Sequence, residues 1–209
     1  MNAPAHLPIR GLPAPLPPGE RLLWQGAPDL APFARSAFHV RAVAIYFALL
    51  AVAASAMALV RHEVPFAAGA TALGGMAACG LLLLMAWAAA RSTVYTVTDR
   101  RIVLRIGVAL PKSINLPLAK VAAIDLSDRG DIVLRMAEAA PLGWLTLWPH
   151  VRPWQVARPQ PMLRCLPDGP QVARMIADAC TALAPELWHQ TPAAAIKPAP
   201  MPVREAVAA

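Results

Sequence analysis

Two long stretches without a charged side chain dominate the pattern of the chain. The first covers residues 42–60 between Arg41 and Arg61, and the second covers 64–90 and stops at Arg91. About 20 apolar residues cross the roughly 30 Å hydrocarbon core as a helix, in which the backbone satisfies its own hydrogen bonds. A buried core helix is normally shorter and keeps a polar stripe. We therefore predict two membrane spans, joined into an antiparallel hairpin by residues 61–63.

The arginines near these spans predict their orientation. The short connection carries only Arg61, whereas the side that holds both termini carries many more basic residues. By the positive-inside rule, both termini are expected in the cytoplasm, with the protein in a bacterial inner or intracytoplasmic membrane. The residues that we expect at the membrane surface are Arg41, Arg91, Arg100, Arg101 and Arg105.

Small residues recur every four positions in the second span and form two rows, one of Ala70, Gly74 and Ala78, the other of Thr71, Gly75 and Cys79. Such a smooth surface lets another helix approach closely. The neighbouring helix is either the first span of the same chain or a helix of another molecule, a second copy included. The predicted helix-packing residues are Ala70, Gly74, Gly75 and Ala78. Neither span contains an ionisable side chain of the kind that ion or proton pathways use.

Downstream of the spans the apolar pattern changes to a period of two. Residues 93–97 and 102–106 alternate around a turn of Thr98, Asp99 and Arg100, which predicts a β-hairpin. Further short strands are expected at 113–116, 122–126, 131–136 and 144–148. Asp168 is a candidate helix cap, and one apolar stripe follows it at Val172, Met175, Ile176, Ala179 and Leu183. This order predicts a small antiparallel sheet closed by one C-terminal helix.

Residues 149–167 contain five prolines, which favour extended, unpaired chain. This ribbon either presents Arg and Trp side chains to a partner or crosses one face of the sheet and buries its tryptophans. His150 is expected to form hydrogen bonds within the ribbon. The candidate partner-binding residues are Trp148, His150, Arg152, Trp154, Arg158 and Arg164.

These patterns divide the chain into five segments. Residues 1–18 and 185–209 are proline-rich tails that we expect to be disordered. Residues 19–41 are a juxtamembrane segment, residues 42–90 the membrane hairpin, and residues 91–184 the cytoplasmic domain.

Composition narrows the functional classes. The 209 residues are 57% hydrophobic and 15% charged, with 23 prolines, which makes a plain soluble enzyme improbable. Three cysteines and five scattered histidines give no metal or redox spacing, and Asp125, Asp128 and Asp131 lack the Glu that closes a calcium loop. We therefore expect a non-catalytic protein without metal or cofactor. The net charge of +7 suits an anionic lipid surface better than nucleic acid, because the basic residues cluster beside the bilayer and no recognition motif is present.

Several motifs taken together resemble bacterial pleckstrin-homology-like (PH-like) membrane proteins. These are Gly19-Glu20, Leu22-Leu23-Trp24 and Gly26-Ala27-Pro28 before the hairpin, and Tyr95-Thr96-Val97-Thr98-Asp99-Arg100-Arg101-Ile102 after it. The resemblance implies a strongly bent antiparallel β-sheet capped by a C-terminal helix. Combined with the spans, the expected fold class is a transmembrane α-hairpin plus a small α+β cytoplasmic domain of PH-like fold.

A narrower resemblance rests on Leu147-Trp148-Pro149-His150-Val151-Arg152-Pro153-Trp154 and Ala157-Arg158-Pro159-Gln160-Pro161-Met162-Leu163-Arg164. With Phe38-His39-Val40-Arg41, Arg105 to Pro111 and Asn115-Leu116-Pro117, these stretches are similar to the PuhB family of photosynthetic complex assembly proteins of purple bacteria. The resemblance implies a factor that binds nascent subunits of the reaction centre and its core antenna. The alternative is a general envelope module that binds anionic lipid through its surface arginines.

Overall fold

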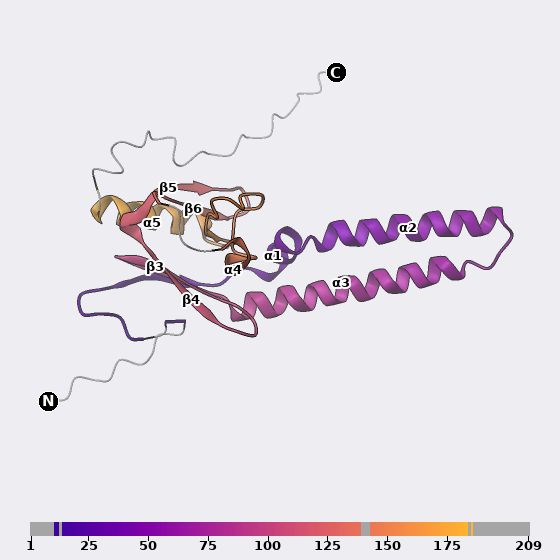
Figure 1. Ribbon diagram of the computed structural model, residues 1–209, viewed down its shortest axis with the longest axis horizontal. Helices are drawn as coiled ribbons and strands as arrows, with labels where there is room; N and C mark the ends of the chain where they lie inside the picture. Colours follow the sequence, from indigo (N-terminus) through magenta and orange to yellow (C-terminus); the bar gives the residue numbers. More distant parts are fainter. Residues whose placement is uncertain (1–10, 13, 139–142, 184, 186–209) are drawn as a thin grey trace, which may run out of the picture.

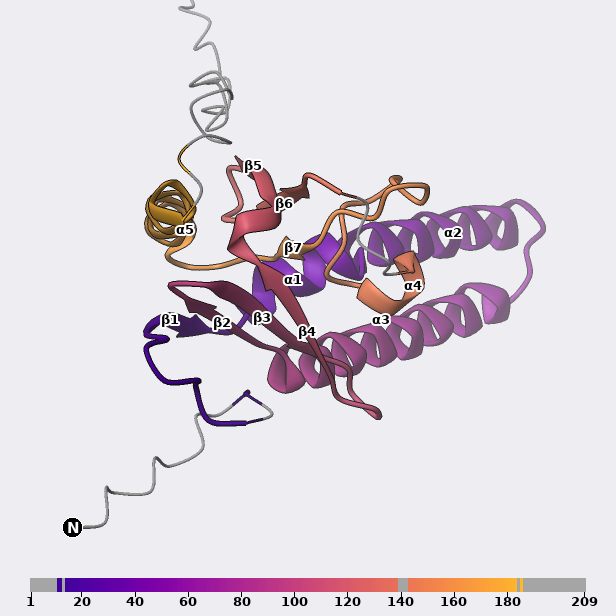
Figure 2. The same cartoon turned by 60° about the vertical axis from the view of Figure 1, so that its left-hand side comes forward.

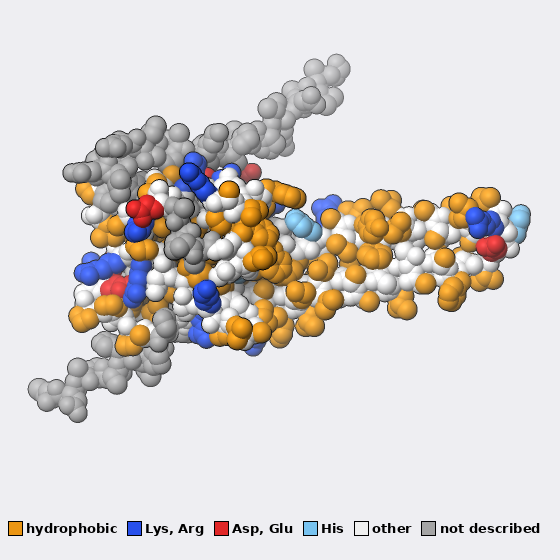
Figure 3. Space-filling view, in the orientation of Figure 1, with side chains coloured by type: hydrophobic (Ala, Val, Ile, Leu, Met, Phe, Trp, Pro, Cys, Tyr) orange, Lys and Arg blue, Asp and Glu red, His pale blue; other side chains and the backbone are white. Residues whose placement is uncertain are grey.

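A long helical hairpin projects from a sheet domain (Figure 1). The computed structural model describes residues 11–12, 14–138, 143–183 and 185. The hairpin consists of α2 (Val40–Val60) and α3 (Phe66–Ser92), which lie side by side along their length. Both helices are long and apolar enough to span a membrane, as the two uncharged stretches predict. Hydrophobic side chains cover the visible face of the hairpin, and charged side chains gather at its ends (Figure 3).

The hairpin is held by small residues of α3 that face α2. Gly75 is buried, and a Cβ built at this position would lie 2.6 Å from the Cβ of Phe47. Because only hydrogen occupies that space, the two backbones approach closely.

The domain contains two antiparallel sheets. The first has the strand order β1 (Leu22–Gly26), β2 (Val94–Thr98), β3 (Arg101–Ile106) and β4 (Lys112–Pro117). The 3-10 helix η1 (Leu118–Lys120) leads to the second sheet, formed by β5 (Val121–Leu126), β6 (Ile132–Met136) and β7 (Met162–Leu163). The predicted strands at 93–97, 102–106, 113–116, 122–126 and 131–136 are thereby confirmed.

The C-terminal helix α5 (Gly169–Leu183) packs against β5 and η1 and completes the core of the domain. Its buried face consists of Val172, Ala173, Ile176 and Cys180. The predicted stripe is therefore rotated: Met175 and Ala179 are half-buried and Leu183 is exposed. The sequence could not distinguish these faces, because apolar residues occupy both.

Residues 144–148 do not form the predicted strand. They begin with a short helix, α4 (Trp144–Leu147), followed by a cis peptide bond between Trp148 and Pro149. Leu147 is buried, whereas Leu145 is largely exposed. A strand would have placed these two leucines on one face, so the three-residue spacing of Trp144 and Leu147 determines the element instead.

The segment before the hairpin belongs to the sheet domain. β1 pairs with β2, although the whole helical hairpin separates these two strands in the sequence. The helix α1 (Leu30–Ala37) lies between the sheet and the hairpin helices (Figure 2). The domain boundary at residue 91 is therefore incomplete, because β1 supplies an edge strand of the first sheet. Most of the predicted tails, residues 1–10 and 186–209, lies outside the described residues, but Gly11 is buried against Val94.

Candidate functional site

The candidate site lies where the membrane hairpin meets the sheet domain. Here α1, α4 and the end of α3 converge with the proline-rich ribbon (Figure 2). A second hydrophobic cluster, separate from the sheet core, fills this junction with Phe33, Ala34, Phe38, Ala86, Ala89, Ala90 and Cys165. Small alanines on α3 let α1 approach, and the phenylalanines of α1 occupy the space between them.

His150 is at the centre of this junction and is 1% exposed. Its Nε2 lies 3.0 Å from Thr93 Oγ1, and its Nδ1 lies 2.6 Å from the Tyr95 hydroxyl. The ring stacks on Phe33 with centroids 5.5 Å apart. The backbone carbonyl of His150 accepts from the Met162 N–H at 2.9 Å, as expected within the ribbon, whereas its side chain bonds to Tyr95 of β2 and to Thr93, the residue before this strand.

The hydrogen-bond donors around His150 fix its tautomer. Thr93 Oγ1 donates its proton to Ala89 O at 2.7 Å, so it accepts from His150 Nε2. The backbone N–H of Arg164 donates to the Tyr95 oxygen, and the Tyr95 hydroxyl donates to Nδ1. Every proton in this chain of bonds has an acceptor when the imidazole is neutral with its proton on Nε2. Burial, and then the nearby Arg164 charge, lower the pKa of His150 to about 3, in agreement with this form.

Cys165 joins the ribbon to α1. Its carbonyl accepts from the Asp29 backbone N–H at 2.9 Å, and its sulfur lies 3.3 Å from Ser36 Oγ. The buried Asp131 carboxylate accepts from the Cys165 backbone N–H at 2.8 Å, so this aspartate is a structural anchor rather than part of a solvated turn. Burial raises the pKa of the Cys165 thiol to about 11 and keeps it protonated.

The six candidate partner-binding residues divide into buried and accessible groups. His150 and Arg164 are buried, and Arg152 is half-buried near Asp125 and Gln160. In contrast, Trp154 is 95% exposed, Trp148 is 42% exposed and Arg158 is also exposed. The ribbon therefore buries its histidine and presents two tryptophans and one arginine. We call Trp148, Trp154 and Arg158 the exposed ribbon surface.

A cavity of about 490 Å³ opens beside the exposed ribbon surface. Its walls are formed by the C-terminal end of α1, the C-terminal half of α3, α4 and the ribbon. The lining residues used below are Phe38, Leu82, Met85, Trp144, Trp148 and Arg164. Arg164 is 6% exposed, and its Nη1 donates to Pro149 O at 3.1 Å.

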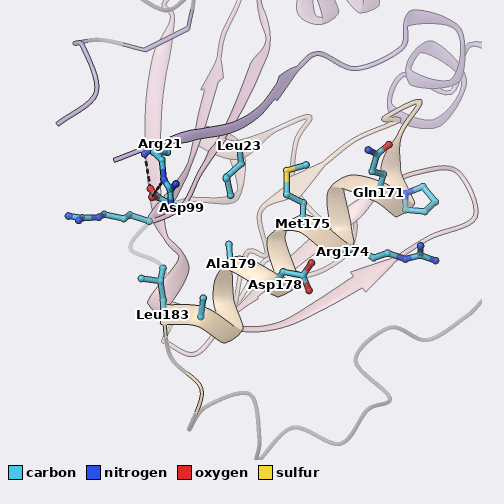
Figure 4. A pocket seen from close by; sticks show the side chains of 12 residues that line it. Arg21, Leu23, Asp99, Gln171, Arg174, Met175, Asp178, Ala179 and Leu183 are labelled. Atoms are coloured by element: carbon cyan, nitrogen blue, oxygen red, sulfur yellow. Dashed lines mark hydrogen bonds and ion pairs between the residues drawn. The ribbon is translucent and has the colours of Figure 1, made fainter. Parts of the chain in front are cut away.

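A larger groove lies at the opposite end of the domain, between the edge of the first sheet and α5. Its volume is about 980 Å³. Leu23 and Met175 lie on facing sides of it, and the Arg21–Asp99 ion pair lies at its rim (Figure 4). Three residues of the predicted α5 stripe, Met175, Ala179 and Leu183, line this groove, and Ala179 also packs against the core.

The predicted membrane-surface arginines occupy both ends of the first sheet. At the end of the sheet next to the hairpin, Arg91 of α3 lies over the Trp87 ring at 5.5 Å. Arg105 lies near the same end, because it pairs in register with Val94, the first residue of β2. Arg100 and Arg101 lie at the far end of the β2–β3 hairpin. There Arg101 Nε donates to the buried Glu20 at 2.9 Å. Arg41 is exposed in the first turn of α2.

The two predicted rows of small residues face different directions. The row of Thr71, Gly75 and Cys79 faces α2, where Gly75 contacts Phe47. Gly74 has no atom within 4 Å of a built Cβ, and Ala70 is exposed, whereas Ala78 is half-buried. The first row therefore packs within the chain through Gly75, whereas Ala70 and Gly74 of the second row remain on the outer surface of the hairpin.

Sequence reasoning did not identify Thr93, Tyr95 or Phe33 as members of this junction. Their alternating pattern indicated only a strand, and α1 was not predicted. Tyr95 and Thr93 are buried polar residues that directly follow α3, and polar side chains at that position are the signal that could have indicated a buried hydrogen-bond partner.

The model of the bacterial PH domain family matches residues 37–179, which include the hairpin and most of the sheet domain. The chain belongs to the bacterial PH domain family. It is also 39% identical over 186 residues to a Rhodobacter capsulatus protein described as an uncharacterized 23.7 kDa protein in the puhA 5′ region. The alignment covers 84% of this chain and 86% of that relative. No solved structure gives a significant match.

Proposed function

We propose that this protein is a non-catalytic assembly factor of the PuhB type, which helps to build the photosynthetic reaction centre and its core antenna in a purple bacterium. The observation that carries the proposal is the similarity to the protein of the puhA 5′ region, a reaction-centre gene region, over most of both chains. The two candidate spans support the proposal, because an assembly factor for membrane subunits is expected in the bilayer that holds them.

The exposed ribbon surface is the proposed contact for the part of a nascent subunit that lies outside the bilayer. Tryptophan and arginine are the residue types that contribute most to binding at protein interfaces. Trp154 and Arg158 are both exposed, and Trp154 lines the same cavity as Leu82 and Met85 of the hairpin. Within the bilayer, the outer row of Ala70 and Gly74 offers a smooth surface to a subunit helix or to a second copy.

The proposed topology has both termini in the cytoplasm and the Arg61–Glu63 connection on the periplasmic side of the inner or intracytoplasmic membrane. Arg41, Arg91 and Arg105 support it, because they place positive charge at the domain end of the hairpin. The buried groups support a non-catalytic role. His150 is held neutral, and the pKa values of Cys165 and Cys180 are raised to about 11 and 12, which disfavours nucleophilic thiolates.

A gene deletion in a photosynthetic host tests the proposal. Reaction-centre absorbance and subunit amounts should fall and should recover when the wild-type chain is supplied. The Trp154→Ala/Arg158→Gln chain should restore them poorly at equal abundance. Arg129→Gln is a matched control, because Arg129 is an exposed arginine in the β5–β6 turn, outside the ribbon. Unchanged assembly in the deletion strain would disprove the assembly role, whereas full rescue by the double variant would disprove the contact surface alone.

A further inference from the structure

The cavity beside the exposed ribbon surface lies at the level where the hairpin enters the bilayer. Arg91 is in the last turn of α3 and stacks on Trp87, an arrangement typical of the membrane interface. Met85 and Leu82 line the cavity from the same helix. At 1.5 Å per residue they lie about 9 and 14 Å deeper along α3 than Arg91. One end of the cavity is thus at head-group depth and the other is at acyl-chain depth.

The wall of the cavity has an apolar part and a polar part. Phe38, Leu82, Met85 and Trp148 supply apolar and aromatic surface. Arg164 and Trp144 supply polar N–H groups. A cavity with one polar and one apolar part is complementary to an amphiphile.

Two buried N–H groups in this wall have no hydrogen-bond partner. They are Arg164 Nε and Trp144 Nε1, and among the described residues they are the buried side-chain nitrogen and oxygen atoms without a partner. Arg164 also forms no ion pair with a carboxylate of the described part of the chain, although it is 6% exposed. Buried donors and buried charges are normally paired. Both unpaired donors therefore point to an acceptor-rich, negatively charged group at this wall.

The N-terminus of α2 also favours an anion in this cavity. α2 begins at Val40 directly after His39, which lines the cavity, and no side chain caps its first turn. The N-terminus of a 21-residue helix carries partial positive charge and favours an anion.

We propose that this cavity holds one anionic phospholipid of the leaflet next to the sheet domain. The phosphate accepts hydrogen bonds from Arg164 and Trp144, and the first part of an acyl chain lies along Met85 and Leu82. The site is distinct from the surface arginines, because its cation is buried within the junction. The proposal does not depend on the assembly role.

The test uses the full chain purified in mild detergent, stripped of lipid and mixed with phosphatidylglycerol or phosphatidylcholine. Native mass spectrometry then counts the lipids retained per chain. We expect one phosphatidylglycerol to be retained, with phosphatidylcholine bound about tenfold more weakly, because the choline cation that it carries beside the same phosphate is repelled by the unpaired charge of Arg164.

Three variants alter the cavity in different ways. Arg164→Gln removes the charge, Trp144→Phe removes only the indole N–H, and Met85→Trp fills the apolar end. Each should weaken phosphatidylglycerol retention, Arg164→Gln by about tenfold. Arg129→Gln is the matched control, because it removes an exposed arginine that neither lines the cavity nor belongs to the exposed ribbon surface. Trp144→Phe and Met85→Trp keep the test valid should Arg164→Gln fail to fold.

Three results would overturn the proposal. The first is equal retention of phosphatidylcholine and phosphatidylglycerol, and the second is unchanged retention in Trp144→Phe and Met85→Trp. The third is displacement of phosphatidylglycerol by equimolar glycerol 3-phosphate, which would indicate a site for a soluble phosphate compound rather than for a lipid.

Discussion

Thr93 Oγ1 and His150 Nε2 lie 3.0 Å apart and join the end of a membrane helix to the proline-rich ribbon, 57 residues further along the chain. The same threonine donates to Ala89 O in the last turns of α3. Through Tyr95, the network continues to the backbone of Arg164. The hairpin and the sheet domain are thus coupled by directional bonds as well as by the alanine and phenylalanine cluster.

Tyr95→Phe tests this coupling. The change removes one hydroxyl and leaves both His150 Nδ1 and the Arg164 backbone N–H without a buried partner. We expect the free energy of unfolding to fall by about 2 kcal/mol. Denaturant unfolding in detergent measures this loss. Tyr46→Phe, at the other tyrosine, which is exposed on α2, should change stability by less than about 0.5 kcal/mol. Equal effects of the two changes would contradict the network.

The neutral state of His150 predicts a dependence of stability on pH. Its pKa falls from the ordinary 6.5 to about 3 on folding. The unfolded chain therefore binds a proton that the folded chain does not between these values, and stability that is complete above about pH 6.5 declines as the pH falls. Between pH 7 and 5.5 the loss from this group should be about 1 kcal/mol. Melting temperatures at both pH values should show a smaller difference for His150→Gln than for the wild type, and equal differences would count against a neutral His150.

Gly75 and Gly74 are adjacent but predict opposite outcomes. Gly75→Ala places a methyl group 2.6 Å from Phe47 Cβ and should destabilise the hairpin by about 1–3 kcal/mol. Gly74→Ala meets no atom within 4 Å and should leave stability unchanged or slightly higher, since alanine favours the helix. Thermal unfolding in detergent compares the two. A larger loss for Gly74→Ala would mean that α2 packs on the other face of α3.

Glu20→Gln tests whether the segment before the hairpin belongs to the domain. The Glu20 carboxylate is buried and accepts from Arg101 Nε at 2.9 Å. Removal of its charge weakens that bond and should cost about 1–2 kcal/mol. Glu138→Gln breaks the exposed Lys120–Glu138 pair and should cost less than about 0.5 kcal/mol. Urea midpoints distinguish the two outcomes, and an unaffected Glu20→Gln midpoint would argue against this role for Glu20.

Local patterns were sufficient for the elements with strong periodicity. The uncharged runs identified α2 and α3, and alternation identified the strands from β2 to β6. The strand prediction for residues 144–148 was wrong, because the apolar residues there fit both helical and strand spacings. These residues are Trp144, Leu145, Leu147 and Trp148. The two-residue strand β7 was missed because prolines surround it.

The site was less accessible to sequence reasoning, because its contacts join distant segments. Trp148 and Trp154 were identified by residue type, and the structure leaves both accessible. His150 and Arg164 were grouped with them, but both are buried, and the His150 ring bonds to Thr93 and Tyr95. Burial of that kind depends on α1, which places Phe33 against His150 and lies more than 100 residues earlier in the chain.

The pairing of β1 with β2 has a consequence for how the chain matures. The ribosome completes β1 long before β2, because the whole hairpin of α2 and α3 lies between them in the sequence. The first sheet closes only when the two ends of the hairpin lie side by side. A chain in which only one of the two candidate spans entered a bilayer would hold β1 and β2 on opposite sides of it, so we predict that this domain folds only after both helices are inserted.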